Sequence, residues 1–237
     1  MSPSSPAGSP PDVGILLAAA GRGERAGAGE PKQFRPIGGV PMLLRAIRPF
    51  AQHPRVCRIV VALPAEHAAQ PPSWLREVVG GRLGIVAGGA TRAASVRAAL
   101  AALPPECSLV LVHDAARPFV SQETIDAVID VASTGVGAVP AIPVSDTLKR
   151  TARGERRVLE TVDRSGLWRA QTPQGFPRPI LEQAYRAAEE SGDWSFTDEA
   201  ALVEAAGHGV VVVPDRSSNV KLTTPEDFAV AEALIVK

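Results

Sequence analysis

Small residues and cations gather directly after the first apolar run of the chain. The segment AAGRGER, residues 19–25, follows that run, and the tripeptide PKQ, residues 31–33, comes soon after it. Glycines such as Gly21 and Gly23 let backbone N–H groups turn toward an anion, and Arg25 and Lys32 bring positive charge to the same stretch. This combination predicts a loop that binds phosphate groups.

Two other phosphate-binding signatures do not fit this loop. Its spacing Gly21-x-Gly23-x-x-Ala26 matches the dinucleotide fingerprint, but that fingerprint opens a helix, which the glycines and proline between residues 27 and 31 disfavour. The expected acidic residue is missing too, because Glu66 is the next acidic residue after a strand. The P-loop ending Gly-Lys-Ser/Thr is absent. Nicotinamide and flavin enzymes and P-loop kinases are therefore disfavoured.

Lysine is scarce in a chain that otherwise uses arginine for its positive charges. Its lysines are Lys32, Lys149, Lys221 and Lys237. A compact ammonium group can act where a planar guanidinium cannot, so a lysine kept in such a chain is a candidate site residue. Chance placement on the surface is the alternative for each of them.

Short runs rich in Val and Ile alternate with longer Ala- and Leu-rich segments of helical period. This pattern is typical of an α/β, Rossmann-like fold, a mostly parallel twisted sheet with helices on both faces. We expect a single domain over residues 13–237. The expected strands are Val13–Ala20, Val56–Leu63, Leu83–Ala87, Leu109–His113, Gly137–Pro140 and Val210–Val213. The expected helices are Pro41–Ala51, Thr91–Leu103, Gln122–Ala132, Pro179–Glu190, Asp198–Ala206 and Pro225–Ile235.

One segment, about residues 145–174, breaks this alternation. It is polar and rich in arginine, and it has no apolar helical face. We expect it to form a β-arm that protrudes from the sheet. Because an isolated pair of strands buries too little surface to be stable, such an arm commonly packs on a second subunit. The segment therefore predicts a homodimer.

Composition and charge limit the partners of this chain. Its 237 residues are 45% hydrophobic, which suffices for one large core. Lys plus Arg and Asp plus Glu are both 25, so no net positive field attracts nucleic acid or an anionic membrane. No apolar run approaches the roughly 20 residues that span a bilayer. We expect a small-molecule partner, with no nucleic acid and no membrane.

The first residues of the chain and its two cysteines indicate the cellular compartment of the protein. Residues 1–12 are rich in Pro and Ser and lack the basic start and apolar stretch of a signal peptide, so we expect a disordered tail. Cys57 and Cys107 lie in or beside apolar runs, which is typical of reduced, buried thiols. Both observations favour a cytoplasmic protein.

Short motifs spread along the chain point to one family. In chain order they are AAGxGxR (19–25), PKQ (31–33), GGxxRxxSV (88–96), HDAARP (113–118), DTxK (146–149), TVDR (161–164), QTPQ (171–174), TDE (197–199) and NxK (219–221). On these motifs the chain resembles the 2-C-methyl-D-erythritol 4-phosphate cytidylyltransferases of the non-mevalonate isoprenoid pathway. The resemblance implies transfer of CMP from CTP to that sugar-alcohol phosphate.

The resemblance also implies roles for residues around the nucleotide. The backbone from Ala19 to Gly23 would hold the triphosphate, and Gly89 and Ser95 would help to recognise cytosine. The CTP-binding residues would thus be Ala19, Ala20, Gly21, Gly23, Gly89, Ser95 and Ala115. The catalytic cations around the α-phosphate would be Arg25, Lys32 and Lys221.

The implied acceptor site contains residues from several motifs. Asp114, Ala115 and Arg117 follow the fourth expected strand, at the carboxyl edge where open α/β sheets bind ligands. Asp114 would meet the sugar hydroxyls or the metal shell, or else cap the next turn. The remaining implied residues are Thr147 and Arg164, which would cross the dimer interface to hold the acceptor phosphate, and Thr172 and Thr197, which would hold the polyol, cap a helix or close a turn.

The implied reaction needs little from acidic or basic side chains. The acceptor is a phosphate monoester and is largely a dianion at neutral pH, so no general base is required. We expect Mg²⁺, or another divalent cation, to bind through the CTP phosphates, with no side-chain ligand apart from a contribution by Asp114. The histidines show no metal-ligand spacing.

Two other functions remain open from the sequence. A ribitol 5-phosphate cytidylyltransferase would share the glycine loop, the PKQ motif and the arm, although HDAARP resembles the methylerythritol enzymes more. A nonenzymatic nucleotide sensor could keep the fold and the base pocket. Its loss of catalysis would make Arg25, Lys32 and Lys221 dispensable, and all three are present.

Overall fold

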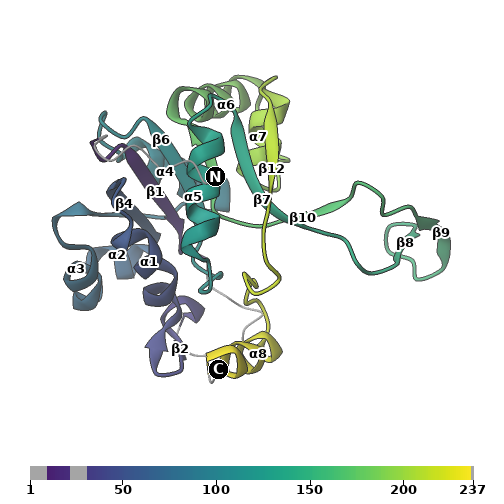
Figure 1. The fold of residues 1–237 in the computed structure, drawn as a ribbon, viewed down its shortest axis with the longest axis horizontal. Helices are drawn as coiled ribbons and strands as arrows, with labels where there is room; N and C mark the ends of the chain where they lie inside the picture. Colours follow the sequence, from purple (N-terminus) through teal and green to yellow (C-terminus); the bar gives the residue numbers. More distant parts are fainter. Residues whose placement is uncertain (1–9, 22–30, 236–237) are drawn as a thin grey trace, which may run out of the picture.

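One twisted sheet forms the centre of the molecule. The computed structural model describes residues 10–21 and 31–235. Within them, an eight-stranded sheet has the order β10-β7-β11-β6-β1-β4-β5, with β12 paired to β7 (Figure 1). Its strands are β1 (Val13–Ala18), β4 (Val56–Leu63), β5 (Leu83–Ala87), β6 (Leu109–Asp114), β7 (Gly137–Pro143), β10 (Trp168–Ala170), β11 (Gln174–Pro177) and β12 (Val210–Pro214). Strands β6, β1, β4 and β5 run parallel, as do β7 and β12, which confirms the expected fold class.

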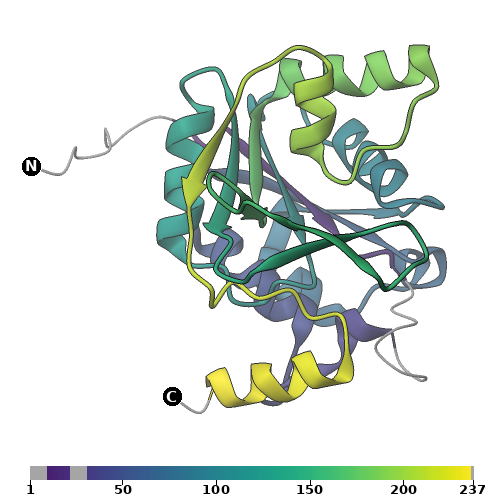
Figure 2. The ribbon, with the colours of Figure 1, turned by 90° about the vertical axis from the view of Figure 1, so that its right-hand side faces the viewer.

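Helices cover both faces of this sheet because its central strands are apolar on both sides. Ile15 and Leu17 of β1 belong to the apolar layer under α1, α3 and α5, whereas Leu16 between them belongs to the layer under α4, α6 and α7. Figure 2 shows helices on either side of the strands. The helices are α1 (Met42–Gln52), α2 (Ala65–Ala69), α3 (Ser73–Val79), α4 (Arg92–Ala101), α5 (Gln122–Ala132), α6 (Arg178–Ser191), α7 (Glu199–Ala205) and α8 (Pro225–Ile235).

Most expected elements are present, with shifts at their ends. Strands Val56–Leu63 and Leu83–Ala87 and helices Gln122–Ala132 and Pro225–Ile235 have the expected bounds. Strand β1 ends at Ala18 rather than Ala20, so Ala19 and Ala20 belong to the loop. Thr91 and Asp198 precede their helices instead of starting them, because their side chains accept hydrogen bonds from the backbone N–H groups of Ala94 and Ala201.

The sequence analysis did not predict helices α2 and α3 or strand β11, which the structure contains. Each of the two helices follows a proline, Pro64 or Pro72, and is shorter than two full turns, so it gives no periodic signal. Strand β11 lies antiparallel between β6 and β7, and its four residues include a glycine and a proline. Its place in the sheet follows from its neighbours rather than from its own composition.

The arm is shorter than the expected segment 145–174. Strands β8 (Leu148–Thr151) and β9 (Val158–Val162) form a separate two-stranded antiparallel sheet, which protrudes to the right in Figure 1. The chain then returns to the main sheet through β10 and β11, because Trp168–Ala170 pair with β7 and Gln174–Pro177 pair with β6. Val158 and Leu159 on the arm are 51% and 61% exposed.

A third, smaller apolar cluster attaches α8 to the rest of the fold. Its members include Ile37, Met42, Ala116, Leu222 and Phe228, and all are buried. Ile37 belongs to a short hairpin formed by β2 (Pro36–Ile37) and β3 (Val40–Pro41). The short helices η2 (Lys32–Phe34) and η3 (Gly80–Arg82) complete the described elements. Because Ile37 and Leu222 both belong to this cluster, it holds the segments that follow Lys32 and Lys221 together beside Ala116.

Candidate active site

A cleft of about 980 Å³ opens at the carboxyl ends of the parallel strands. The ends of β1, β5 and β6 form its floor, which is the edge where open α/β sheets bind ligands. The segments around Lys32 and Lys221 complete its wall. Its lining consists of Ala18, Ala19, Ala20, Gly21, Lys32, Gln33, Met42, Pro64, Ala65, Gly88, Gly89, Ala90, Thr91, Arg92, Ser95, Asp114, Ala115, Ala116, Lys221 and Thr223.

A buried carboxylate organises the charged side of this cleft. Asp114, at the end of β6, is 6% exposed. Its Oδ2 lies 2.6 Å from Lys221 Nζ, and its Oδ1 accepts a hydrogen bond from Arg92 Nε at 2.9 Å. Burial alone would raise the pKa of Asp114, but the charges of Arg92 and Lys221 lower it well below its ordinary value. Asp114 is therefore ionised at neutral pH.

A second buried carboxylate lies behind the first. Arg92 Nη1 donates to both carboxylate oxygens of Glu199, each at 2.8 Å, and the Tyr185 hydroxyl donates to Glu199 Oε1 at 3.2 Å. Glu199 is 2% exposed, and this burial raises its pKa even though the charge of Arg92 acts in the opposite direction. Lys221, Asp114, Arg92 and Glu199 thus form a row of alternating charges.

Lys32 lines the cleft beside the segment that contains Lys221. It is the first residue of η2, and its Nζ donates to the backbone oxygen of Leu222 at 3.3 Å. Leu222 is the neighbour of Lys221 in the chain, so this bond joins the two lysine-bearing segments. The two ammonium groups therefore line one cleft although they are far apart in the sequence.

Close backbone packing keeps one end of the cleft narrow. A Cβ atom on Gly88 would lie 2.1 Å from the Cβ of Ala20, and one on Gly89 would lie 2.6 Å from the Cβ of Ala94. The hydroxyl of Ser95 accepts a hydrogen bond from the Gly89 N–H at 3.1 Å and donates to the Thr91 backbone oxygen at 2.9 Å. Only glycine fits at these two positions, so the cleft is lined there by backbone alone.

Comparison with known proteins identifies the family of this chain. The pattern of the family described as 2-C-methyl-D-erythritol 4-phosphate cytidylyltransferase matches residues 13–237. The chain belongs to this family. A relative of that name from Salinibacter ruber is 44% identical, over 94% of this chain and 92% of its own length. One from Streptomyces coelicolor is 43% identical, over 97% of this chain and 87% of its own. The crystal structure from Thermus thermophilus has a TM-score of 0.80 at 35% identity, covering 95% of this chain and 100% of that one.

The structure brings together most of the nucleotide residues expected for a cytidylyltransferase. Ala19, Ala20, Gly21, Gly89, Ser95 and Ala115 all line the cleft, with Lys32, Lys221 and Asp114. Gly23 and Arg25 lie outside the described residues. Within the described part of the cleft lining, Asp114 is the one acidic residue. The described residues contain no group of three or more His, Cys, Asp or Glu side chains that could hold a metal ion.

Thr172 and Arg117 lie under the cleft and do not line it. The Thr172 hydroxyl accepts a hydrogen bond from the Asp114 N–H at 3.1 Å and lies 2.9 Å from His113 Nδ1. His113 Nε2 lies 3.0 Å from the Arg117 backbone oxygen, so Nε2 carries the proton and Nδ1 accepts from Thr172. Arg117 Nη1 donates to the Asn219 backbone oxygen at 2.7 Å. These contacts fix the backbone of Asp114 and the segment before Lys221.

The other expected acceptor residues are found elsewhere. Thr197 lines a separate small cavity of about 30 Å³ beside Tyr185 and Trp194. Thr147 precedes β8 and Arg164 follows β9, and both are exposed on the arm. The Arg164 guanidinium donates to the backbone oxygen of Ser145, within the arm. Neither residue reaches the cleft of its own chain.

Arg92 and Glu199 are site residues that the sequence analysis did not assign, although both stand inside quoted motifs. Each is the first residue of a helix, α4 or α7. An arginine at this position is unfavourable, because the helix N-terminus is the positive end of its dipole. This conflict at Arg92 was the available signal for a functional position.

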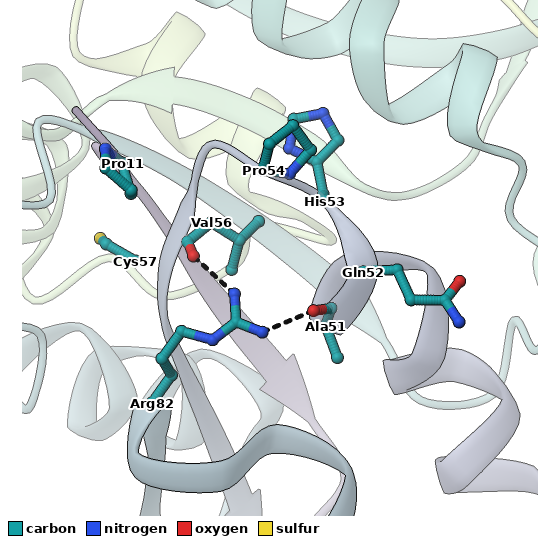
Figure 3. Close-up of a pocket in the computed structure, with 8 residues that line it drawn as sticks. All are labelled: Pro11, Ala51, Gln52, His53, Pro54, Val56, Cys57 and Arg82. Atoms are coloured by element: carbon teal, nitrogen blue, oxygen red, sulfur yellow. Dashed lines mark hydrogen bonds between the residues drawn. The ribbon is translucent and has the colours of Figure 1, made fainter. Parts of the chain in front are cut away.

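A second hollow, of about 520 Å³, lies at the amino ends of the strands (Figure 3). Pro11, Pro54 and Cys57 are among its lining residues. Its one arginine, Arg82, donates to the backbone oxygens of Val56 at 2.8 Å and Ala51 at 2.5 Å. The guanidinium therefore ties η3 to α1 and β4, and the hollow offers no group of charged side chains for chemistry.

The buried imidazole of His113 predicts a pH dependence of stability. Burial lowers the pKa of His113 from its ordinary value of 6.5 to about 4. Between these values the unfolded chain binds a proton that the folded chain does not, so stability falls as the pH decreases below 6.5. Urea unfolding between about pH 7 and pH 5 should show this loss, and His113→Asn should flatten the slope.

The comparison with His113→Asn isolates this imidazole, because the raised pKa of Glu199 contributes with the opposite sign in both proteins. An identical slope in the variant would contradict a neutral, buried His113.

Proposed function

We propose that this chain transfers CMP from CTP to 2-C-methyl-D-erythritol 4-phosphate and releases pyrophosphate, a step of isoprenoid precursor synthesis. Family membership over residues 13–237 supports this reaction. The observation that carries it is that Lys32 and Lys221 line one cleft together, where Lys32 Nζ bonds the backbone oxygen of Leu222, and that the same cleft is lined by bare backbone at Gly88 and Gly89. Such a cleft fits a triphosphate beside a flat pyrimidine.

The backbone of Ala19, Ala20, Gly21 and Gly23 holds the triphosphate in this proposal, and Gly89, Ser95 and Ala115 hold the cytidine. Amide groups of a glycine-rich loop after a strand suit phosphate oxygens. Lys32, Lys221 and Arg25 surround the α-phosphate, where negative charge is concentrated during transfer.

The chemistry is an in-line displacement at phosphorus. A phosphate oxygen of the acceptor attacks the α-phosphorus of CTP and forms a new O–P bond. The bond from the α-phosphorus to the oxygen that bridges to the β-phosphorus breaks, and pyrophosphate leaves with its electron pair. The acceptor oxygen is already ionised at neutral pH, so no side chain must remove a proton. The protein offsets the repulsion between the two anions with its cations.

A divalent cation fits this cleft through the nucleotide. Both carboxylate oxygens of Asp114 are engaged, with Arg92 and Lys221, so the described cleft lining supplies no ready set of side-chain ligands. Phosphate oxygens and water supply the ligands that Mg²⁺ prefers, with Asp114 the one nearby carboxylate. Bound in this way, the metal would neutralise charge on the phosphates during transfer.

The arm completes the acceptor site of a second copy in this proposal. Thr147 and Arg164 are exposed on it and lie outside the cleft of their own chain. The arm also exposes Val158 and Leu159, and within the part of the chain that the structure describes its strands pair only with each other. A homodimer buries these apolar side chains and brings a guanidinium to the acceptor phosphate. Thr197 supports the polyol end of the acceptor. Thr172 and Arg117 support it indirectly, because they hold the backbone of Asp114.

The nucleotide substrate and the family favour the cytoplasm as the compartment of the reaction. Among the described residues, no helix is long and apolar enough to cross a membrane.

Pyrophosphate release tests the reaction directly. With CTP and Mg²⁺, we expect turnover with 2-C-methyl-D-erythritol 4-phosphate and little with D-ribitol 5-phosphate. A coupled phosphate assay measures both under the same conditions. Preference for ribitol 5-phosphate would move the chain to the sister activity, and turnover with neither would support the nucleotide sensor.

The two cleft lysines should each be needed for turnover. We expect Lys32→Ala and Lys221→Ala to lower kcat at least about a hundredfold, roughly 2.7 kcal/mol of barrier, because each removes a charge beside the α-phosphate. Arg76→Ala, at an exposed position of α3, is the matched control and should keep normal turnover. Near-normal turnover of either lysine variant would remove that lysine from the mechanism.

Mixed dimers test the contribution of the arm. Lys32→Ala disables a cleft, and Arg164→Ala disables an arm, so a heterodimer of the two variants has one intact cleft facing one intact arm. Random co-assembly should restore about a quarter of the wild-type activity, since half of the dimers are mixed and each has one working site. A mixture of Lys32→Ala with Lys221→Ala should restore nothing. Equal activity of both mixtures would show that each site lies within one chain.

A further inference from the structure

Glu199 is the deepest charge at the cleft and has no assigned role in the reaction. It is 2% exposed and does not line the cleft. Its partners are Arg92, which donates from Nη1 to both carboxylate oxygens, and the hydroxyl of Tyr185. A buried carboxylate is costly unless its charge is compensated, so the fold keeps Glu199 here at some expense of stability. The position of Glu199 behind Arg92 indicates which role could offset this loss of stability.

Arg92 is shared between two carboxylates that lie on different elements. Its Nε bonds Asp114 at the end of β6, while its Nη1 bonds Glu199 at the start of α7. Its side chain is 29% exposed and lines the cleft. A guanidinium is long and carries several donors, so without Glu199 it could take both oxygens of Asp114 or turn toward an anion in the cleft.

The sharing of Arg92 leaves one oxygen of Asp114 for Lys221. Asp114 Oδ1 bonds Arg92 and Oδ2 lies 2.6 Å from Lys221 Nζ. If Arg92 turned fully onto Asp114, the two cations would compete for the same carboxylate. Lys221, whose side chain is 44% exposed, would then lose its one ion-pair partner among the described residues.

We propose that Glu199 is a positioning residue for the transfer reaction. By holding the guanidinium of Arg92 at the back of the cleft, it reserves Asp114 Oδ2 for Lys221 and so fixes the ammonium group beside the α-phosphate. This role rests on the function proposed above. It acts through Arg92 and Asp114, and Glu199 itself touches no substrate.

Kinetics of Glu199→Gln test the proposal. The substitution keeps the shape of the side chain and removes its charge. We expect kcat to fall at least about tenfold while KM for CTP stays unchanged or decreases, because Arg92 is free to attract the triphosphate while Lys221 is misplaced. Glu189→Gln is the control, since Glu189 pairs with Arg97 across α6 and α4 at the surface and should change neither constant. A raised KM with unchanged kcat would overturn the proposal.

The small number of lysines permits a measurement that needs no activity. Reductive methylation with labelled formaldehyde gives each of the four lysines a ¹³C-dimethylamino signal, and Lys221→Arg identifies the signal of Lys221. We expect Glu199→Gln to move the Lys221 signal and to leave that of Lys149 on the arm in place. An unmoved Lys221 signal would overturn the proposal even if turnover had fallen. Failure of the wild type to release pyrophosphate would refute only the proposed function, because the spectrum still reports the position of Lys221.

Two further variants separate positioning from simple loss of stability. Arg92→Lys should reproduce the kcat effect of Glu199→Gln and move the same signal, because one ammonium group cannot span both carboxylates. Tyr185→Phe removes a hydrogen bond to Glu199 but keeps the charge, so it should lower thermal stability and leave the Lys221 signal in place. If Tyr185→Phe moved the Lys221 signal as far as Glu199→Gln does, general loosening would explain both and the proposal would fail.

Discussion

The ionised carboxylate of Asp114 is the constraint on which the rest of this site depends. A nearly buried charge at the end of β6 is tolerated only if cations reach it, and removing one partner of such a pair is costly. The two cations come from distant elements, Arg92 from the start of α4 and Lys221 from the segment before α8. Pairing at this point therefore fixes how these elements meet, and Arg92 also pairs with Glu199 through Nη1.

The apolar sheet makes this polar edge possible. Because Ile15 and Leu16 face opposite helical layers, the sheet is held from both sides and its carboxyl edge stays free for loops. The hydrogen bonds of Thr172 with Asp114 and His113 then connect this carboxyl edge to the buried core. Catalytic side chains placed on such rigid supports need little reorganisation when charge develops, which is how electrostatic stabilisation of transfer becomes effective.

The arm follows a different physical rule from the cleft. Among the described residues, strands β8 and β9 pair only with each other and leave Val158 and Leu159 exposed, so the arm shows no core of its own there. The same segment holds Thr147 and Arg164, far along the chain from the cleft residues. Stability of the arm and completion of the acceptor site would thus have one common cause, which is the arrival of a second copy.

The sequence by itself determined the strands and helices whose period is strong, such as Val56–Leu63 and Gln122–Ala132, and its motifs singled out Lys32 and Lys221, which both line the cleft. Local pattern suffices for these because period and motif are properties of neighbouring residues. Only the tertiary structure decided that β11 lies antiparallel between β6 and β7, and that Thr172 and Arg117 lie beneath the cleft. It alone joined Arg92, Asp114 and Glu199, since a salt bridge between residues 107 positions apart depends on how the chain returns and leaves no trace in local spacing.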